Sequence, residues 1–303
     1  MSENRLAIAT YAESQAELCC ALRLIHSLRR FGGRLNGSPV SICVPRELFA
    51  RAAAGEIADA AAQILPVDLP PSHRWLLYSG KVYAAAAAEA SAGSDAPLAW
   101  LDCDTIVLDE PREFLLPPGF ALAFRPVMHN RSGSLYDLPP NAYWTRIYDL
   151  LDLDDDLLFP MLSQADEQKI RAYFQAGSLV VNPAAGILQG WPEAFEQLAR
   201  DPVLNEMCRV DRTLNVFLHQ AALVGAVLHG VRGKVMIELS EKYSYPVFFE
   251  RQYGGNRHFE DISDVATLRC VVSFKSLGPN WPQELVGSAD KIAWLRQHLE
   301  TTE

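Results

Sequence analysis

Residues 97–108 read PLAWLDCDTIVL, an apolar run that contains two aspartates separated by one residue. A short apolar run of this kind predicts a buried strand. Carboxylates are not stable inside a core without a partner, so Asp102 and Asp104 mark the point where the strand should reach the edge of its sheet. Alternate residues of a strand point the same way, and the two carboxylates could therefore bind one divalent cation. The competing interpretation is structural, with one aspartate capping a turn and the other paired with a basic group.

Strand and helix patterns alternate on the N-terminal side of this run. Ser14, with Glu17 three residues later, forms a capping box that predicts the start of a helix directly after the first strand. The expected strands are residues 5–11, 40–44 and 63–67, and the expected helices are residues 18–31, 46–60 and 76–92. This alternation predicts an α/β fold with a doubly wound, mostly parallel sheet. Lys81 lies in the third helix, where spacing alone does not say whether it faces a ligand or solvent.

The C-terminal side is less regular. Residues 125–160 lose periodicity and predict an inserted loop and helix segment within a single domain of residues 1–303. Gly177, inside an apolar strand pattern, would permit close approach of a ligand or another backbone segment. Asp211 precedes apolar residues at helical spacing and is expected to be an N-cap. The remaining expected strands are residues 120–124, 176–183, 226–229, 235–239 and 270–274, and the remaining helices are residues 191–200 and 289–299.

Composition excludes several classes of function. The chain has 303 residues, 49% of them hydrophobic, which is enough to bury a full core. A net charge of -10 and the absence of a Lys/Arg block argue against nucleic-acid binding. The six cysteines form no CxxC pair and are expected to be reduced thiols. No signal peptide or transmembrane pattern is present, so a cytoplasmic location is expected.

The histidines do not predict a site. His73, His129, His219, His229 and His258 share no spacing typical of metal ligands. Isolated histidines are more often surface or core residues than ligands. None of them is therefore a candidate site residue on sequence grounds.

Three motifs taken together resemble the GT-A glycosyltransferases, most closely the glycogenin-like and lipopolysaccharide galactosyltransferase-like group. Residues 100–108, WLDCDTIVL, resemble the DxD strand of that family. Residues 173–183, YFQAGSLVVNP, resemble its FNxGvlvvN strand, and residues 211–215, DRTLN, resemble the DQxxLN start of a helix. The resemblance implies a GT-A fold and transfer of a sugar from a nucleotide-diphosphate sugar, with a UDP-sugar favoured and the acceptor unspecified.

The resemblance also implies roles for individual residues. Asp102 and Asp104 would bind Mn²⁺ or Mg²⁺ bridging the donor diphosphate, and the nucleoside would lie near Thr10 and Tyr11. Lys81 would neutralise the donor or pair with an aspartate.

Two further residues are expected beside the transferred sugar. Gln175 stands where the family usually has asparagine, and Asp211 would face the sugar hydroxyls. Both are candidate catalytic residues.

The late part of the chain departs from the family pattern. Residues 273–281, SFKSLGPNW, align with the family's HFxGxxKPW element. Ser273 then replaces the metal-ligand histidine, and Pro279 replaces the phosphate-binding lysine. Lys275 could supply the missing positive charge to the donor.

Three hypotheses about function follow from these observations. The leading one is a nucleotide-sugar-dependent glycosyltransferase. A second is a GT-A-like protein that binds nucleotide but has lost turnover, for which Ser273 and Pro279 are the supporting features. The third is an aspartyl-phosphate phosphohydrolase, because Asp102 and Asp104 resemble part of a DxDx[TV] nucleophile motif.

Overall fold

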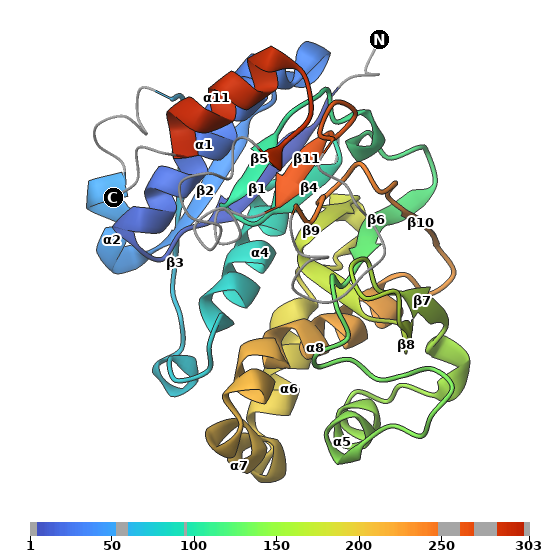
Figure 1. The fold of residues 1–303 in the computed structure, drawn as a ribbon. Helices are drawn as coiled ribbons and strands as arrows, with labels where there is room; N and C mark the ends of the chain where they lie inside the picture. Colours follow the sequence, from blue (N-terminus) through green and yellow to red (C-terminus); the bar gives the residue numbers. More distant parts are fainter. Residues whose placement is uncertain (1–4, 53–59, 94–95, 248–260, 270–283, 300–303) are drawn as a thin grey trace.

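Seven strands form the central sheet of the computed structural model, in the order β10-β6-β9-β4-β1-β2-β3 (Figure 1). The structure describes residues 5–52, 60–93, 96–247, 261–269 and 284–299. The strands of the central sheet are β1 (Ala7–Tyr11), β2 (Val40–Pro45), β3 (Gln63–Val67), β4 (Leu98–Leu101), β6 (Phe120–Pro126), β9 (Phe174–Val181) and β10 (Val235–Glu238). Neighbouring strands run parallel except at β9, which is antiparallel to both β4 and β6.

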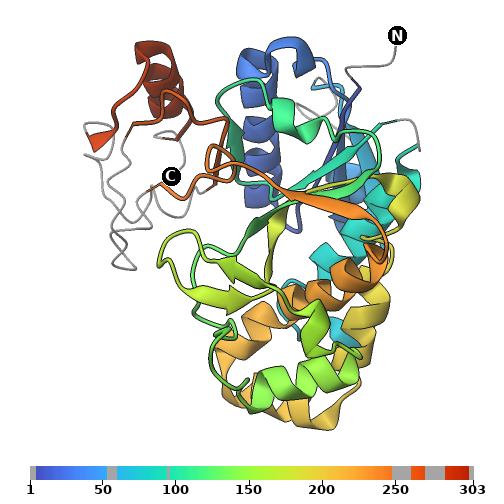
Figure 2. The ribbon, with the colours of Figure 1, turned by 90° about the vertical axis from the view of Figure 1, so that its right-hand side faces the viewer.

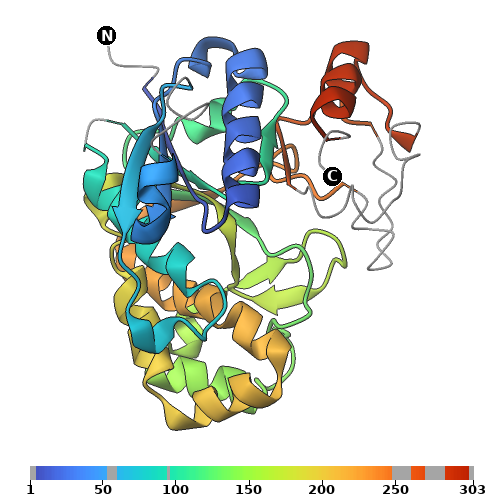
Figure 3. The same ribbon diagram turned by 90° about the vertical axis from the view of Figure 1, so that its left-hand side faces the viewer.

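Helices cover both faces of this sheet, as Figures 2 and 3 show from two sides. The helices are α1 (Gln15–Phe31), α2 (Arg46–Ala52), α4 (Ser79–Ser91), α5 (Ala142–Leu150), α6 (Trp191–Ala199), α7 (Pro202–Val210), α8 (Arg212–Gly230) and α11 (Ala289–Leu299). Leu98 and Trp100 of β4 belong to the apolar cluster that includes α4 and α8, whereas Ala99 and Leu101 belong to the cluster that includes α1. A strand whose alternate side chains enter two cores is buried on both faces. The predicted α/β fold with a doubly wound, mostly parallel sheet is therefore confirmed.

The run at residues 97–108 forms two strands instead of one. β4 ends at Leu101, a turn contains Cys103 and Asp104, and β5 (Thr105–Val107) follows. β5 pairs outside the central sheet, antiparallel to β11 (Thr267–Arg269). The expectation that the aspartates lie on one pleated strand is therefore wrong. The physical reason is that buried carboxylates need polar partners, which a turn can offer and a continuous ladder between apolar layers cannot.

Two other parts of the chain were expected from the sequence to form a strand and an inserted loop and helix segment. The expected strand at residues 226–229 is wrong, because α8 continues to Gly230. This helix is buried nearly all round from Leu218 to Leu228, so its apolar run has no exposed face to reveal a helical period. The expected inserted segment contains α5, whose Tyr143, Trp144 and Ile147 are buried in the larger core. The hairpin of β7 (Pro160–Leu162) and β8 (Lys169–Arg171) follows it.

The last described part of the chain lies beside α1. Trp294 of α11 makes an edge-on contact with Phe31, with ring centroids 5.8 Å apart. Ile106, Leu268 and Leu295 belong to a third apolar cluster, which joins β5, β11 and α11. Residues 273–281, with Ser273, Lys275 and Pro279, and the expected strand at 270–274 lie outside the described residues. Among the helices that are described, none has the length and apolar character needed to span a bilayer.

Candidate active site

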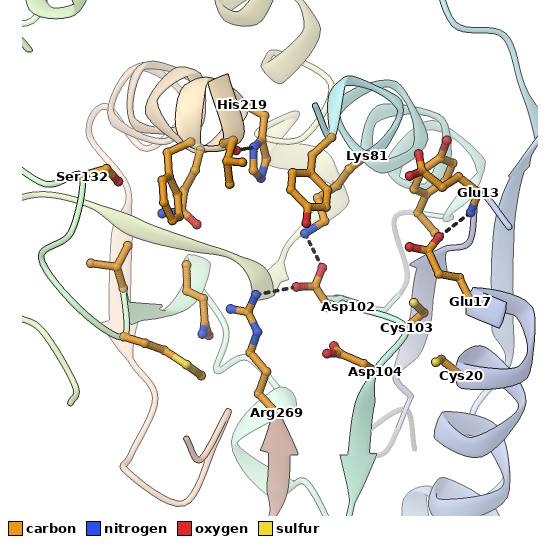
Figure 4. A pocket seen from close by; sticks show the side chains of 18 of the residues that line it. Glu13, Glu17, Cys20, Lys81, Asp102, Cys103, Asp104, Ser132, His219 and Arg269 are labelled. Carbon is orange, nitrogen blue, oxygen red and sulfur yellow. Dashed lines mark hydrogen bonds and ion pairs between the residues drawn. The ribbon is translucent and has the colours of Figure 1, made fainter. Parts of the chain in front are cut away.

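A cavity of about 480 Å³ lies where the C-terminal ends of β1 and β4 meet the beginning of β9 (Figure 4). Tyr11 at the end of β1, Asp102 directly after β4 and Gln175 near the start of β9 all line it. The helix after β1 covers one face of the sheet and the helix before β4 covers the other. Such a switch point, at the carboxyl ends of parallel strands, is the usual place for a ligand crevice in α/β folds.

Asp102 is held by two cations. Its Oδ1 forms an ion pair with Lys81 Nζ, and its Oδ2 lies 3.1 Å from Arg269 Nη2. Lys81 therefore faces the cavity, from the first turn of α4. Burial opposes ionisation of Asp102, but the charges of Lys81 and Arg269 outweigh burial and lower its pKa to about 2. Asp102 is thus a carboxylate at any physiological pH.

Gly177 explains how Asp102 fits into this position. The Asp102 amide donates to Gly177 O at 2.9 Å, and a Cβ on Gly177 would overlap the Asp102 carboxylate. The close approach expected of this glycine is therefore made to the aspartate side chain. Any larger residue at position 177 must displace Asp102.

Asp104 has a different environment. Burial and the negative charge of Asp102 raise its pKa, while Arg269 and Lys81 act on it less strongly in the opposite direction. No ion pair to Asp104 is found in the described part of the chain. Cys103, between the two aspartates, lines the cavity together with Cys20 of α1. Of the two aspartates, Asp104 therefore has less positive charge beside its carboxylate.

His219 of α8 also lines the cavity. Its side chain lies between Trp191 and Tyr78, with ring centroids 6.1 Å and 5.2 Å away. Burial, with the charge of Lys81, lowers its pKa to about 3. The ring is therefore neutral at physiological pH.

Gln175 is almost completely buried and belongs to the lining of the same cavity. Its Oε1 accepts a hydrogen bond of 2.6 Å from Ser244 Oγ. Its Nε2 is buried and has no hydrogen-bond partner among the described residues. A buried amide donor without a partner is costly in an empty site and favourable in one that binds an acceptor.

The other expected site residues are distributed unevenly. Tyr11 lines the cavity, and its hydroxyl lies so close to Gly80 that a Cβ there would overlap it. Thr10 is fully buried and is not part of the lining. Asp211 is exposed, caps α8 by accepting from Thr213 N at 2.7 Å, and does not line the cavity. The expectation that Asp211 is an N-cap is confirmed, and the structure does not bring it to the other candidates. Lys275 lies outside the described residues.

Sequence reasoning missed Arg269 and His219. Arg269 comes from β11, far from β4 in the chain, and only the pairing of β11 with β5 brings it to Asp102. No sequence pattern signals that pairing. His219 lies on an apolar helix face next to Leu218 and Gln220, a position that is typical of a core histidine. Its one distinguishing feature, an open cavity in front of the ring, is a tertiary property.

The charges that line the cavity fit a divalent cation. Among the described residues, the acidic side chains of the lining are Glu13, Glu17, Asp102 and Asp104, and its positively charged side chains are Lys81 and Arg269. Acids outnumber cations, so a doubly negative diphosphate would be repelled unless further positive charge accompanied it. Carboxylate oxygens are also the ligands that Mg²⁺ and Mn²⁺ prefer. No cluster of three or more metal-ligating side chains is found within the described ranges.

A comparison with protein families assigns the chain. Residues 9–230 match the family model described as "Rhodobacterales glycosyltransferase domain", and this range includes the end of β1, the turn with both aspartates, β9 and α8. No curated protein sequence matches the chain.

Several solved structures are remotely similar. The galactosyltransferase LgtC, in complex with donor and acceptor sugar analogues, is 15% identical with a TM-score of 0.45, over 98% of this chain and 97% of that one. GlyE of Streptococcus pneumoniae TIGR4 is 11% identical with a TM-score of 0.45, over 99% of this chain and 61% of that one. Mouse xyloside xylosyltransferase 1, in its apo form, is 10% identical with a TM-score of 0.46, over 89% of this chain and 98% of that one. The assignment to a family rests on the family model alone.

Proposed function

The chain belongs to the Rhodobacterales glycosyltransferase domain family, and we propose that its cavity binds a nucleotide-diphosphate sugar and passes the sugar to an acceptor. The observation that carries this proposal is the turn with Asp102 and Asp104 at the switch point of the sheet, beside Lys81 and Arg269. This arrangement joins oxygen ligands for a cation with two side chains that can neutralise phosphate. A diphosphate can coordinate such a cation and also pair with the two positively charged side chains.

The two aspartates would have different roles in binding the ion. Asp104 would supply the less compensated carboxylate to Mn²⁺ or Mg²⁺, and Asp102 would share the ion while remaining close to Lys81 and Arg269. A bound divalent ion offsets the charge that grows on a leaving diphosphate. Lys81 and Arg269, on opposite oxygens of Asp102, would stabilise the same charge from the protein side.

The remaining residues support an orientation for the donor. Tyr11 and Glu17 line the cavity at the end of β1, which favours this side for the nucleoside. Gln175, with its unpartnered Nε2, would then donate to the transferred sugar. The resemblance of the motifs favours a UDP-sugar. Asp211, exposed at the N-cap of α8, is left out of this arrangement.

Calorimetric titration of UDP, GDP and CMP, each with and without Mn²⁺, tests the proposal. We expect UDP to bind, and the factor by which Mn²⁺ increases UDP affinity to equal the factor by which UDP increases Mn²⁺ affinity, as linkage requires. A hydrolysis assay on a panel of nucleotide sugars should then release UDP. No binding of any nucleotide would contradict the proposal. Binding without turnover on any sugar or acceptor would instead favour the alternative of a nucleotide-binding protein without activity. The phosphohydrolase alternative receives no support from the family.

A further inference from the structure

The His219 side chain is fixed in the wall of the cavity. It is 5% exposed, and it contacts the rings of Trp191 and Tyr78. Trp191 Nε1 also donates to the His219 carbonyl at 2.7 Å, which ties this turn of α8 to α6. Figure 4 shows the ring directed from α8 into the cavity toward Lys81. A ring held in this way presents one edge to any ligand.

The hydrogen bond that His219 makes to the backbone determines which of its ring nitrogens is presented to a ligand. His219 Nδ1 lies 2.8 Å from the carbonyl oxygen of Val216. A carbonyl oxygen only accepts, so Nδ1 must carry the hydrogen. In a neutral imidazole the other nitrogen, Nε2, is then an acceptor. Burial and the charge of Lys81 keep the pKa low, so this tautomer persists at neutral pH.

Gln175 offers the complementary group. Gln175 also lines the cavity, and because Ser244 Oγ donates to Gln175 Oε1, its Nε2 remains a buried donor without a hydrogen-bond partner among the described residues. One acceptor and one donor are thus held on rigid elements, α8 and β9, in the wall of a single cavity. A hydroxyl group both donates and accepts, and it is the polar group that such a pair matches.

We propose that His219 Nε2 accepts a hydrogen bond from a hydroxyl of the transferred sugar, which makes His219 a specificity-determining residue with Gln175 as the matching donor. This inference rests on the proposed function and adds the side chain that recognises a hydroxyl of the sugar. A diphosphate at neutral pH has acceptors only, so His219 would not favour it. The nucleoside is expected beside Glu17, and Figure 4 shows Glu17 and His219 toward different sides of Asp102.

The test compares the affinity of the enzyme for UDP with its affinity for UDP-glucose and UDP-galactose, all in Mn²⁺. His219→Phe keeps the aromatic contacts and removes the acceptor, whereas His219→Gln retains an acceptor at similar reach. We expect His219→Phe to weaken binding of the better UDP-sugar by about tenfold to a hundredfold. UDP affinity should not change, and His219→Gln should recover part of the loss.

The matched control is His229→Phe. His229 lies on the same helix and its Nε2 also contacts a backbone carbonyl, that of Leu151 at 2.7 Å, but it does not line the cavity. This variant should bind UDP and UDP-sugars as the wild type does. An equal loss in both phenylalanine variants would mean that disturbance of α8, and not the lost acceptor, is responsible, and the inference would be wrong.

A measurement on the wild type keeps the inference testable if the variants fold poorly. In protein with ¹⁵N-labelled histidine, the Nε2 resonance of His219 should be that of an unprotonated nitrogen, and it should move on addition of the UDP-sugar but not of UDP. An Nε2 that carries the proton, or a resonance that responds equally to both ligands, would overturn the inference while leaving nucleotide binding intact. If the wild type binds no nucleotide at all, the proposed function fails first and this inference fails with it.

Discussion

Two aspartates one residue apart, Asp102 and Asp104, have opposite electrostatic environments. Spacing predicts two equivalent ligands, because nothing in the pattern distinguishes them. Lys81 and Arg269 both form ion pairs with Asp102, and their charges lower its pKa to about 2. The pKa of Asp104 moves the other way, because it is buried beside the negative charge of its neighbour. The motif was therefore predictable and the division of roles within it was not, since Arg269 arrives through a distant strand pair.

This difference predicts that the two asparagine variants behave differently. In Asp104→Asn, Mn²⁺ should no longer increase UDP affinity, because the less compensated ligand is lost. In Asp102→Asn the cations Lys81 and Arg269 lose their shared carboxylate, so UDP affinity without metal should increase by about tenfold. Calorimetric titration of UDP into each variant, with and without Mn²⁺, measures both effects. Identical behaviour of the two variants would show that the aspartates are equivalent ligands after all.

Gly177→Ala is expected to disable the site without changing any ligand residue. The new methyl group overlaps the Asp102 carboxylate and must push it from Lys81 and Arg269. UDP affinity in Mn²⁺ should fall by about tenfold or more, and the free energy of unfolding should fall by about 2 kcal/mol. Gly37→Ala is the matched control, because a Cβ at Gly37 meets nothing within 4 Å. Wild-type affinity in Gly177→Ala would mean that Asp102 does not need this position.

At the scale of elements, the alternation of apolar runs was sufficient to predict the sheet and most of its helices. The N-caps at Ser14 and Asp211 are both found, although the Glu17 carboxylate accepts from Glu13 N and not from Ser14 N as a capping box requires. The break between β4 and β5 was not predictable, since both halves have the same apolar, β-prone composition and only their pairing partners differ. The strand expected at residues 226–229 failed for a related reason, because a helix buried on all sides has no polar face to show its period.

The attachment of α4 to the turn before α6 is expected to depend on pH through Glu89. Glu89 Oε2 accepts from Gln189 N at 2.7 Å, and burial raises its pKa from 4.5 to about 7. Between pH 4.5 and 7 the Glu89 carboxyl group is therefore protonated in the native state and ionised in the unfolded state. The free energy of unfolding has its full contribution from Glu89 below about pH 4.5, and it falls by about 3 kcal/mol in total as the pH rises to 7.

Glu89→Gln should remove this loss, because an amide carbonyl can accept the same backbone hydrogen bond without a charge. Urea unfolding should show the variant to be more stable than the wild type by about 3 kcal/mol near pH 8, with the difference vanishing near pH 4.5. Glu206→Gln, at an exposed position of α7, serves as control and should change neither value. A difference between Glu89→Gln and the wild type that does not vary with pH would contradict the expected titration.

At the scale of the whole molecule, two apolar clusters enclose the sheet and a third joins β5, β11 and α11 to it. Leu268 of the third cluster precedes Arg269 on β11 and pairs with Ile106 of β5. The single domain expected from the sequence predicts that all three clusters unfold together. Leu268→Ala, at a fully buried position, should lower the free energy of the one transition by about 3 kcal/mol, seen equally by tryptophan fluorescence and far-UV circular dichroism.

Val286→Ala, at a residue that is 59% exposed, is the matched control for that experiment and should leave the transition unchanged. Two separate transitions in Leu268→Ala would mean that the C-terminal cluster is an independent unit. In that case Arg269 would reach Asp102 across a boundary between units.

We expect the cavity at the ends of β1 and β4 to hold a cation and a donor diphosphate together. A crystal grown with UDP and Mn²⁺, measured for the anomalous scattering of manganese, would show whether it does. We expect an anomalous peak in contact with the Asp104 and Asp102 carboxylates and with both phosphates of UDP, with the nucleoside on the side of Tyr11. UDP bound elsewhere on the protein, or UDP in this cavity with manganese distant from both aspartates, would contradict it.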